Sequence, residues 1–122
     1  MTGLLDTSVV LGPSPTLPDE VAISVITIAE LKLGVLVAAS ALERASRLER
    51  LVELERTDSP LPVDDDVASA YATIVAAERE RGRKPRAIDA LIAATALARD
   101  LTLYTRDQAL AGLSSVRVEL VR

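Results

Sequence analysis

Short apolar runs alternate with longer amphipathic segments along this chain. Runs of Leu, Val and Ile, bounded by Thr, Ser, Gly or Pro, predict buried strands at 3–6, 21–24, 101–105 and 116–121. Apolar residues at helical spacing predict helices at 27–39, 41–56, 64–82 and 87–100. The segment 12–20 holds three prolines and is predicted to be a loop, whereas 107–112 is expected to form a short turn or helix.

This alternation of strands and helices predicts the fold class. It indicates an α/β fold in which helices flank a mostly parallel central sheet. A chain of 122 residues is long enough for one core, so we expect a single domain over 1–122. In such sheets ligands bind beyond the carboxyl ends of the strands. Functional side chains are therefore expected just after the strands.

The composition restricts the chemistry. Cys and His are absent from the sequence, which excludes disulfides, thiolate-bound zinc and any Ser-His-Asp arrangement. Acid–base or metal chemistry must therefore rely on carboxylates. The net charge of −4 opposes broad binding to nucleic acid but permits a local basic patch. No apolar run reaches the length of a membrane span and no signal-peptide pattern opens the chain, so we expect a cytoplasmic protein that does not contact membranes.

Four acidic residues stand where a parallel sheet would bring them together. Asp6 and Asp107 lie at or just after the ends of predicted strands, and Glu30 and Asp89 lie near the starts of predicted helices. Carboxylates that share a cleft raise one another's pKa unless a cation neutralises them. Mg²⁺ or Mn²⁺ suits an oxygen-only site, and such a metal can activate water and stabilise charge on a phosphoryl group.

Each of these acids also has a structural interpretation. Glu30 fits a capping box with Thr27, Asp89 could complement a helix dipole, and Asp107 could be an ordinary turn residue. Asp6 differs because an acid beside a buried strand is costly without a partner. The hydroxyls of the turn residues Thr7 and Ser8 are candidates to orient it.

The ordered motifs "LLDTSVV", "ISVITIAELKLG", "IDALIAATAL" and "LTLYTRD" resemble the PIN-domain ribonucleases, in particular the VapC toxins of bacterial toxin–antitoxin pairs. The resemblance spans nearly the whole chain and implies a three-layer PIN-like domain. It places Asp6, Glu30, Asp89 and Asp107 in the positions of the family's catalytic and metal-binding acids. The chain departs from the family in the short stretch between Asp6 and Glu30, so we expect the first helix to be reduced to the Pro-rich loop. It also lacks the aromatic residue that often follows the last acid.

This resemblance implies a function. We expect a metal-dependent endoribonuclease toxin that uses one or two Mg²⁺ or Mn²⁺ ions to hydrolyse RNA phosphodiester bonds. It also implies a small cognate antitoxin and a homodimer, for which helices 27–39 and 42–56 offer apolar surface. One alternative is a phosphate-handling module of the receiver or haloacid-dehalogenase-like phosphatase class, although "GLLDTS" lacks the paired acids that both expect. The other alternative is a non-catalytic domain with the same fold.

The segment 78–86 carries five basic and two acidic residues directly before the helix of Asp89. Arg and Lys near a helix C-terminus can be simply a solvated helix end. With the resemblance in view, we interpret Arg83, Lys84 and Arg86 as an RNA-binding lip beside the metal site. Arg106, next to Asp107, is a weaker candidate for the same role.

Overall fold

Parallel strands form the centre of the molecule. The computed structural model describes residues 2–13, 17, 20–57 and 59–122. Within these residues the sheet has four strands in the order β2-β1-β3-β4, all paired in parallel. The strands are β1 (Gly3–Leu5), β2 (Val21–Ile23), β3 (Thr102–Thr105) and β4 (Val118–Leu120). The predicted mostly parallel sheet is confirmed.

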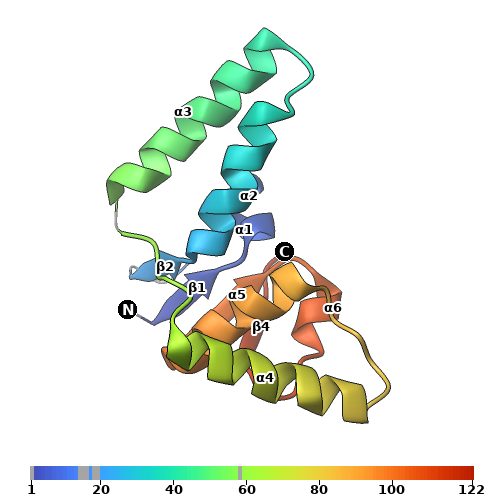
Figure 1. The fold of residues 1–122 in the computed structure, drawn as a ribbon. Helices are drawn as coiled ribbons and strands as arrows, with labels where there is room; N and C mark the ends of the chain where they lie inside the picture. Colours follow the sequence, from blue (N-terminus) through green and yellow to red (C-terminus); the bar gives the residue numbers. More distant parts are fainter. Residues whose placement is uncertain (1, 14–16, 18–19, 58) are drawn as a thin grey trace.

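Helices cover both faces of this sheet (Figure 1). They are α1 (Thr7–Leu11), α2 (Val25–Leu36), α3 (Ala41–Thr57), α4 (Asp65–Glu80), α5 (Ala87–Ala98) and α6 (Gln108–Ala111). One hydrophobic core joins the sheet to α4, α5 and α6, and a second joins it to α1, α2 and α3. The arrangement is a three-layer α/β fold, as predicted.

The alternation of side chains along β1 explains how one short strand serves both cores. Leu4 lies opposite Leu103 of β3 and belongs to the core under α4 and α5. Leu5 lies opposite Tyr104 and belongs to the core under α1, α2 and α3. Successive side chains of a strand point to opposite faces, so a run of two leucines supplies one anchor to each layer.

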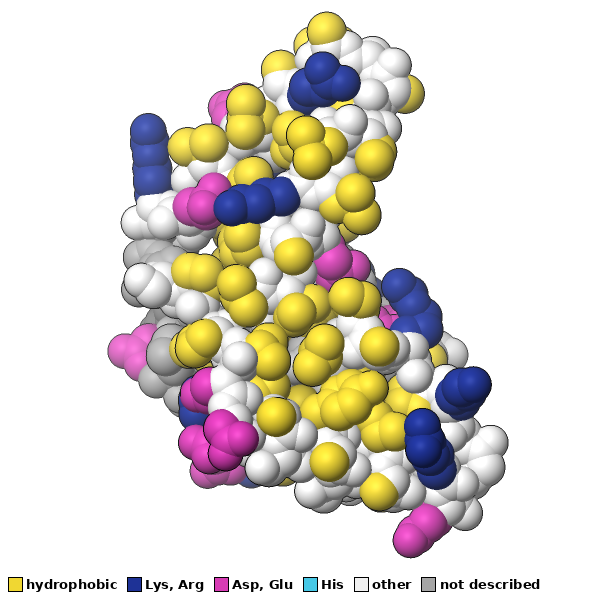
Figure 2. All heavy atoms as spheres, in the orientation of Figure 1, with side chains coloured by type: hydrophobic (Ala, Val, Ile, Leu, Met, Phe, Trp, Pro, Cys, Tyr) yellow, Lys and Arg dark blue, Asp and Glu magenta, His cyan; other side chains and the backbone are white. Residues whose placement is uncertain are grey.

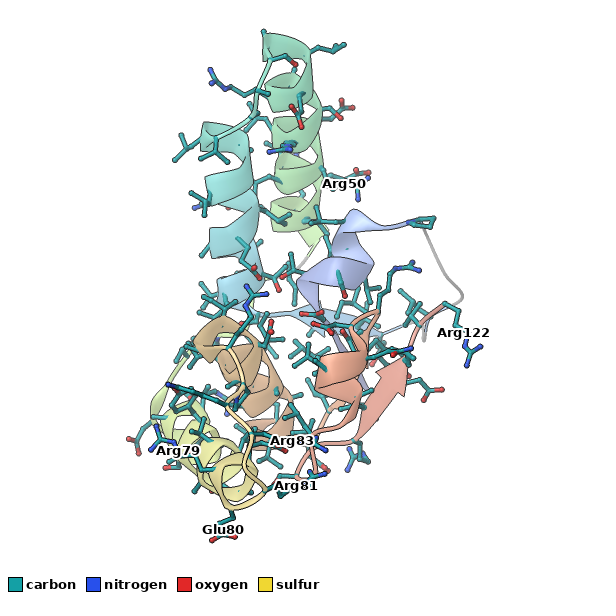
Figure 3. All side chains as sticks on the ribbon, turned by 90° about the vertical axis from the view of Figure 1, so that its right-hand side faces the viewer. Arg50, Arg79, Glu80, Arg81, Arg83 and Arg122 are labelled. Carbon is teal, nitrogen blue, oxygen red and sulfur yellow. The ribbon has the colours of Figure 1, made fainter. Side chains whose placement is uncertain are left out.

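Helices α2 and α3 form an antiparallel pair that projects from the body as an arm (Figure 1). Arg50 of α3 donates to the carbonyl of Val10 and ties the arm to α1 (Figure 3). The predicted apolar stripe of α3 is only partly covered, because Leu51 is buried whereas Leu42 is 83% exposed and Leu48 is also exposed. Figure 2 shows hydrophobic side chains over the arm. The arm therefore presents apolar surface, as the sequence indicates.

Helix α1 corrects one prediction. The sequence pattern places Thr7 and Ser8 in a turn and reduces the first helix to the loop 12–20, part of which lies outside the described residues. Instead a short helix covers Thr7–Leu11. Its Val9 is buried against the sheet. Burial of apolar side chains in the tertiary structure stabilises a helix that is too short to be stable alone.

The start of α2 corrects a second expectation. Ser24 is the N-cap, and its hydroxyl accepts a hydrogen bond from the backbone N–H of Ile26 at 3.0 Å. Thr27 is fully buried inside the helix rather than at its cap. The capping box of Thr27 and Glu30 is therefore absent, and Glu30 is available for another role.

None of the described helices is long and apolar enough to cross a bilayer.

Candidate active site

Asp6 stands at the carboxyl end of the central strand β1, where it is only 5% exposed. Its Oδ2 accepts hydrogen bonds from the hydroxyls of Ser8 at 2.7 Å and Thr105 at 2.8 Å. These two donors offset part of the cost of burying a carboxylate. Ser8 thus orients Asp6, as the sequence suggests. Thr105 was not predicted, because it is distant in sequence and reaches Asp6 only through the pairing of β3 with β1.

Glu30 reaches the same region from α2. Its Oε1 accepts a hydrogen bond from the hydroxyl of Thr7 at 2.6 Å. The Thr7 hydroxyl also lies 3.1 Å from the hydroxyl of Thr27, which is buried. Thr7 therefore orients Glu30 and not Asp6. The first turn of α1 thus contacts two of the acids, through Thr7 and Ser8.

Asp107 follows β3 and caps the short helix α6. Its Oδ1 accepts a hydrogen bond from the backbone N–H of Ala109 at 2.9 Å, and its own N–H donates to the hydroxyl of Thr105 at 3.0 Å. Asp107 therefore has the expected turn role, and it also lines a pocket together with Asp89. Thr105 connects Asp107 to Asp6 through one hydroxyl group.

Asp89 lies in the first turn of α5, with one oxygen 3.9 Å from the guanidinium of Arg86. Burial raises the pKa of Asp89, and the charges of Asp6, Asp107 and Glu30 raise it further, while Arg86 acts in the opposite direction. All three other acids thus act electrostatically on Asp89. The four acids proposed from the sequence therefore gather in one region.

This raised pKa gives a testable stability change. A carboxyl group whose pKa is raised by folding holds extra protons in the folded state, so its contribution to stability falls as the pH rises through the carboxylate range. We expect Asp89→Asn to melt above the wild type at pH 7 in EDTA. The difference should close near pH 3, where both side chains are neutral. Thermal melts across this pH range measure it, and a variant that melts below the wild type at pH 7 would contradict it.

The acids share a feature that suits a divalent cation. Each has one oxygen contacted by protein, from Ser8 and Thr105, Thr7, Ala109 or Arg86. Within the described ranges, no hydrogen-bond donor reaches the second oxygen of any of the four. In this same part of the chain, no three acidic side chains are gathered tightly enough to enclose an ion. These acids would therefore not enclose a cation, and Mg²⁺ can bind through one or two carboxylates and keep several waters.

A pocket of about 260 Å³ lies beside Asp89 and Asp107. The predicted lip residues line it together with Glu78 and apolar side chains; the lining is Glu78, Arg83, Lys84, Pro85, Arg86, Asp89, Asp107, Ala109, Leu110 and Leu113. Figure 2 shows acidic side chains in the notch between the arm and the body, with basic side chains next to them. The structure thus places basic groups next to the acids. Such groups can contact the phosphates of a phosphodiester substrate.

The four basic candidates differ in exposure and in the number of contacts that they make within the protein. Lys84 and Arg86 are exposed, and no described residue forms a hydrogen bond or ion pair with Lys84. Arg83 donates to the carbonyl of Gly112 at 3.2 Å. Arg106 donates to the carbonyl of Pro13 at 2.6 Å and lies against Gly12, where a Cβ atom would meet its Nε at 2.6 Å. Arg83 and Arg106 are therefore partly engaged within the protein.

A second, larger hollow of about 580 Å³ lies between α2, α3 and α1. Its lining includes Glu30 at one edge and apolar side chains such as Leu11, Leu31 and Leu42. Of the four acids only Glu30 reaches it. This hollow therefore suits a protein segment better than a phosphate group.

Comparisons with known proteins agree with this geometry. The PIN domain family model matches residues 4–115. Ribonuclease VapC5 of Mycobacterium tuberculosis is 40% identical over 128 residues, covering 98% of this chain and 94% of that protein. Toxin FitB of Neisseria gonorrhoeae is 36% identical over 123 residues, covering 85% and 86%. A chain in the crystal structure of VapBC-5, a toxin–antitoxin system of M. tuberculosis, superimposes with a TM-score of 0.88 at 41% identity and covers 98% of both chains.

Proposed function

This chain belongs to the PIN-domain family, and on that basis we propose that it is a metal-dependent endoribonuclease, the toxin of a type II toxin–antitoxin pair. One observation carries the proposal. Four carboxylates on four different elements gather at the carboxyl edge of the sheet, each with an oxygen left free by the described residues. The chain acts as one nuclease domain over 1–122, in the cytoplasm.

The roles of the acids follow from their surroundings. Asp6, Asp89 and Asp107 would hold Mg²⁺ or Mn²⁺, and Glu30 would help directly or through a water molecule. When bound, the metal supplies an activated water and stabilises charge on the phosphoryl group. Thr105, Ser8 and Thr7 keep the carboxylates in place before substrate arrives, and this preorganisation of the site favours catalysis.

The RNA backbone is held by the basic lip. Lys84 and Arg86 contact phosphates, and Arg83 and Arg106 add positive charge close to the acids. Contacts of this kind position the chain of RNA without reading its bases. The site contains no side-chain nucleophile in this scheme, because the attacking group is water.

The decisive experiment combines an in vitro assay with expression in cells. Purified protein and total RNA are incubated with Mg²⁺, with Mn²⁺ or with EDTA, and the new RNA ends are mapped. We expect discrete internal cuts that need the divalent metal and disappear in EDTA. Mapping after induced expression should give the same cut sites. Binding of RNA without cleavage under every metal condition would instead support a non-catalytic module.

The arm provides surface for partners. Its large exposed apolar side chains are Val25, Leu33, Leu36, Val37, Leu42, Leu48 and Val52. Contiguous exposed apolar surface often marks a protein–protein interaction site. One of the similar structures, VapBC-5, is a member of the VapBC family of toxin–antitoxin systems, and a second, FitAcB of Neisseria gonorrhoeae, superimposes with a TM-score of 0.80 at 34% identity. This protein pairs with a second copy of itself and binds a small antitoxin. Sedimentation showing only monomer at high micromolar concentration would contradict the dimer.

A further inference from the structure

Glu78, in the last turn of α4, is buried although Glu is usually exposed. It is 1% exposed. Its Oε1 lies 3.3 Å from a guanidinium nitrogen of Arg81, and its Oε2 lies 3.9 Å from one of Arg83. Oε2 accepts no hydrogen bond within the described part of the chain. A buried carboxylate so incompletely paired costs stability, which calls for a reason why it is there.

Both arginines reach across to the same acceptor. Arg81 and Arg83 each donate to the carbonyl oxygen of Gly112 at 3.2 Å. In Figure 3 both side chains extend from the end of α4 and the loop after it toward the C-terminal part of the chain, whereas Glu80 points away. A Cβ atom on Gly112 would meet the Arg83 guanidinium at 2.9 Å, so glycine permits this close approach. We call Glu78, Arg81, Arg83 and Gly112 the clamp.

The clamp holds the far end of the helix that presents Asp107. Helix α6 has only four residues, its N-cap is Asp107 and its C-cap is Gly112. So short a helix has little stability of its own, and two buried side chains, Leu110 within it and Leu113 just after it, anchor it in the core. The tie at Gly112 adds two hydrogen bonds at the C-terminal end of the helix. The clamp therefore contributes to the orientation of α6, and with it to the place of the Asp107 carboxylate.

The negative charge of Glu78 is what keeps the two arginines there. Their side chains are 41% and 50% exposed, so without a counter-charge they would be free to extend into solvent. A single carbonyl acceptor would hold them weakly. Glu78 and Arg83 also line the same pocket as Asp89 and Asp107. The clamp thus stands directly behind the acids.

We propose that Glu78 is a positioning residue, which acts through Arg81, Arg83 and Gly112 to hold Asp107 opposite Asp89 in the metal site. This inference rests on the proposed function, because it gives Asp107 a role in binding the metal. It also divides the basic segment into two parts. Arg81 and Arg83 serve the clamp, whereas Lys84 and Arg86 remain for RNA.

The first test compares Glu78→Gln with Glu80→Gln. Glu80 is exposed on the same helix and forms no hydrogen bond or ion pair within the described residues, so it serves as a matched control. The readout is the Mn²⁺ concentration that gives half of the metal-induced rise in melting temperature, without RNA. We expect this concentration to rise about tenfold in Glu78→Gln, as for other residues that support metal ligands indirectly. It should not change in Glu80→Gln.

A second variant covers the case in which Glu78→Gln fails to fold. Gly112→Ala leaves every charge in place, and the backbone at Gly112 (φ −83°, ψ −2°) accepts alanine. The added methyl displaces the Arg83 guanidinium from its carbonyl acceptor. We expect the same weakening of Mn²⁺ binding. In cleavage assays at fixed metal, both variants should lower kcat and leave KM for RNA nearly unchanged.

A double-mutant cycle shows whether the effect passes through Asp107. Once Asp107→Asn is present, Glu78→Gln should weaken Mn²⁺ binding no further. Combined with Asp6→Asn it should still weaken it. A Glu78→Gln protein that loses stability but keeps the wild-type Mn²⁺ midpoint would show a merely structural role and overturn the proposal. A wild type that Mn²⁺ does not stabilise at all would overturn the metal site itself, and the proposed function with it.

Discussion

Replacing Asp6 by Asn should abolish RNA cleavage while leaving the fold intact. The two side chains have nearly the same shape, and the amide oxygen can still accept the hydroxyls that now bond the carboxylate, those of Ser8 and Thr105. The negative charge that holds a divalent cation is removed. Because metal catalysis contributes several kcal/mol, and each 1.36 kcal/mol corresponds to a factor of ten, we expect cleavage to fall by about a thousandfold. Rates on end-labelled RNA and circular dichroism melts measure the two effects.

The companion variants separate site residues from ordinary acids. Asp89→Asn and Asp107→Asn should be as damaging as Asp6→Asn, and Glu30→Gln equally or slightly less so. Asp65→Asn is the control, because Asp65 is exposed in the first turn of α4. It should cleave at the wild-type rate. Wild-type cleavage by Asp6→Asn with normal metal binding would remove the basis for the assignment.

Replacing Lys84 and Arg86, the two basic residues assigned to RNA, by alanine should weaken RNA binding in a salt-dependent way. Each neutralised phosphate releases counterions from RNA, so the logarithm of affinity falls linearly with the logarithm of salt concentration. A double Ala variant of Lys84 and Arg86 should reduce this slope by about 0.7 for each single-strand phosphate that these side chains neutralise in the wild type. Binding of a fluorescent RNA from low to high salt, in an Asp6→Asn background that does not cut, measures it.

Arg79→Ala is the matched control for that experiment. Arg79 is exposed on α4 and does not line the pocket beside Asp89 (Figure 3). The control should keep both the wild-type slope and the wild-type Mn²⁺ midpoint. If the Lys84 and Arg86 variant keeps the wild-type slope, the segment is only a solvated helix end.

The gathering of the acids could be predicted from the sequence because it follows from topology. Strands that are parallel end at one edge of the sheet, and helices that follow them start there. Asp6, Asp107 and the start of α5 can therefore be placed from the sequence, whereas α2 begins at Val25, earlier than predicted. Helix α1 was not predicted, because five residues next to a Pro-rich segment carry little periodic signal and the helix depends on burial of Val9.

The contacts that orient the acids could not be predicted in the same way. Thr105 reaches Asp6 across 99 positions, and Thr7 reaches Glu30 across 23. Local pattern gives no information about such pairs. The burial of Glu78 could not be predicted for another reason. The stretch "AERERGR" has the pattern of a solvated helix end, in which a glutamate is expected to be exposed. Glu78 lies beside residues that are distant in sequence, such as Ala109, Leu110 and Leu113, and the local sequence pattern does not show this proximity.

The strand order has a consequence for how the protein is made. The first strand to be synthesised, β1, pairs with β3, which comes from the last quarter of the chain. Thr105, which holds Asp6, and Asp107 itself arrive only with that late segment. Chains are synthesised from the N-terminus at about 5–20 residues per second, and a domain generally folds as a unit. A nascent chain that has not yet released residues 102–107 therefore has no assembled cleft, and it cannot yet cleave RNA.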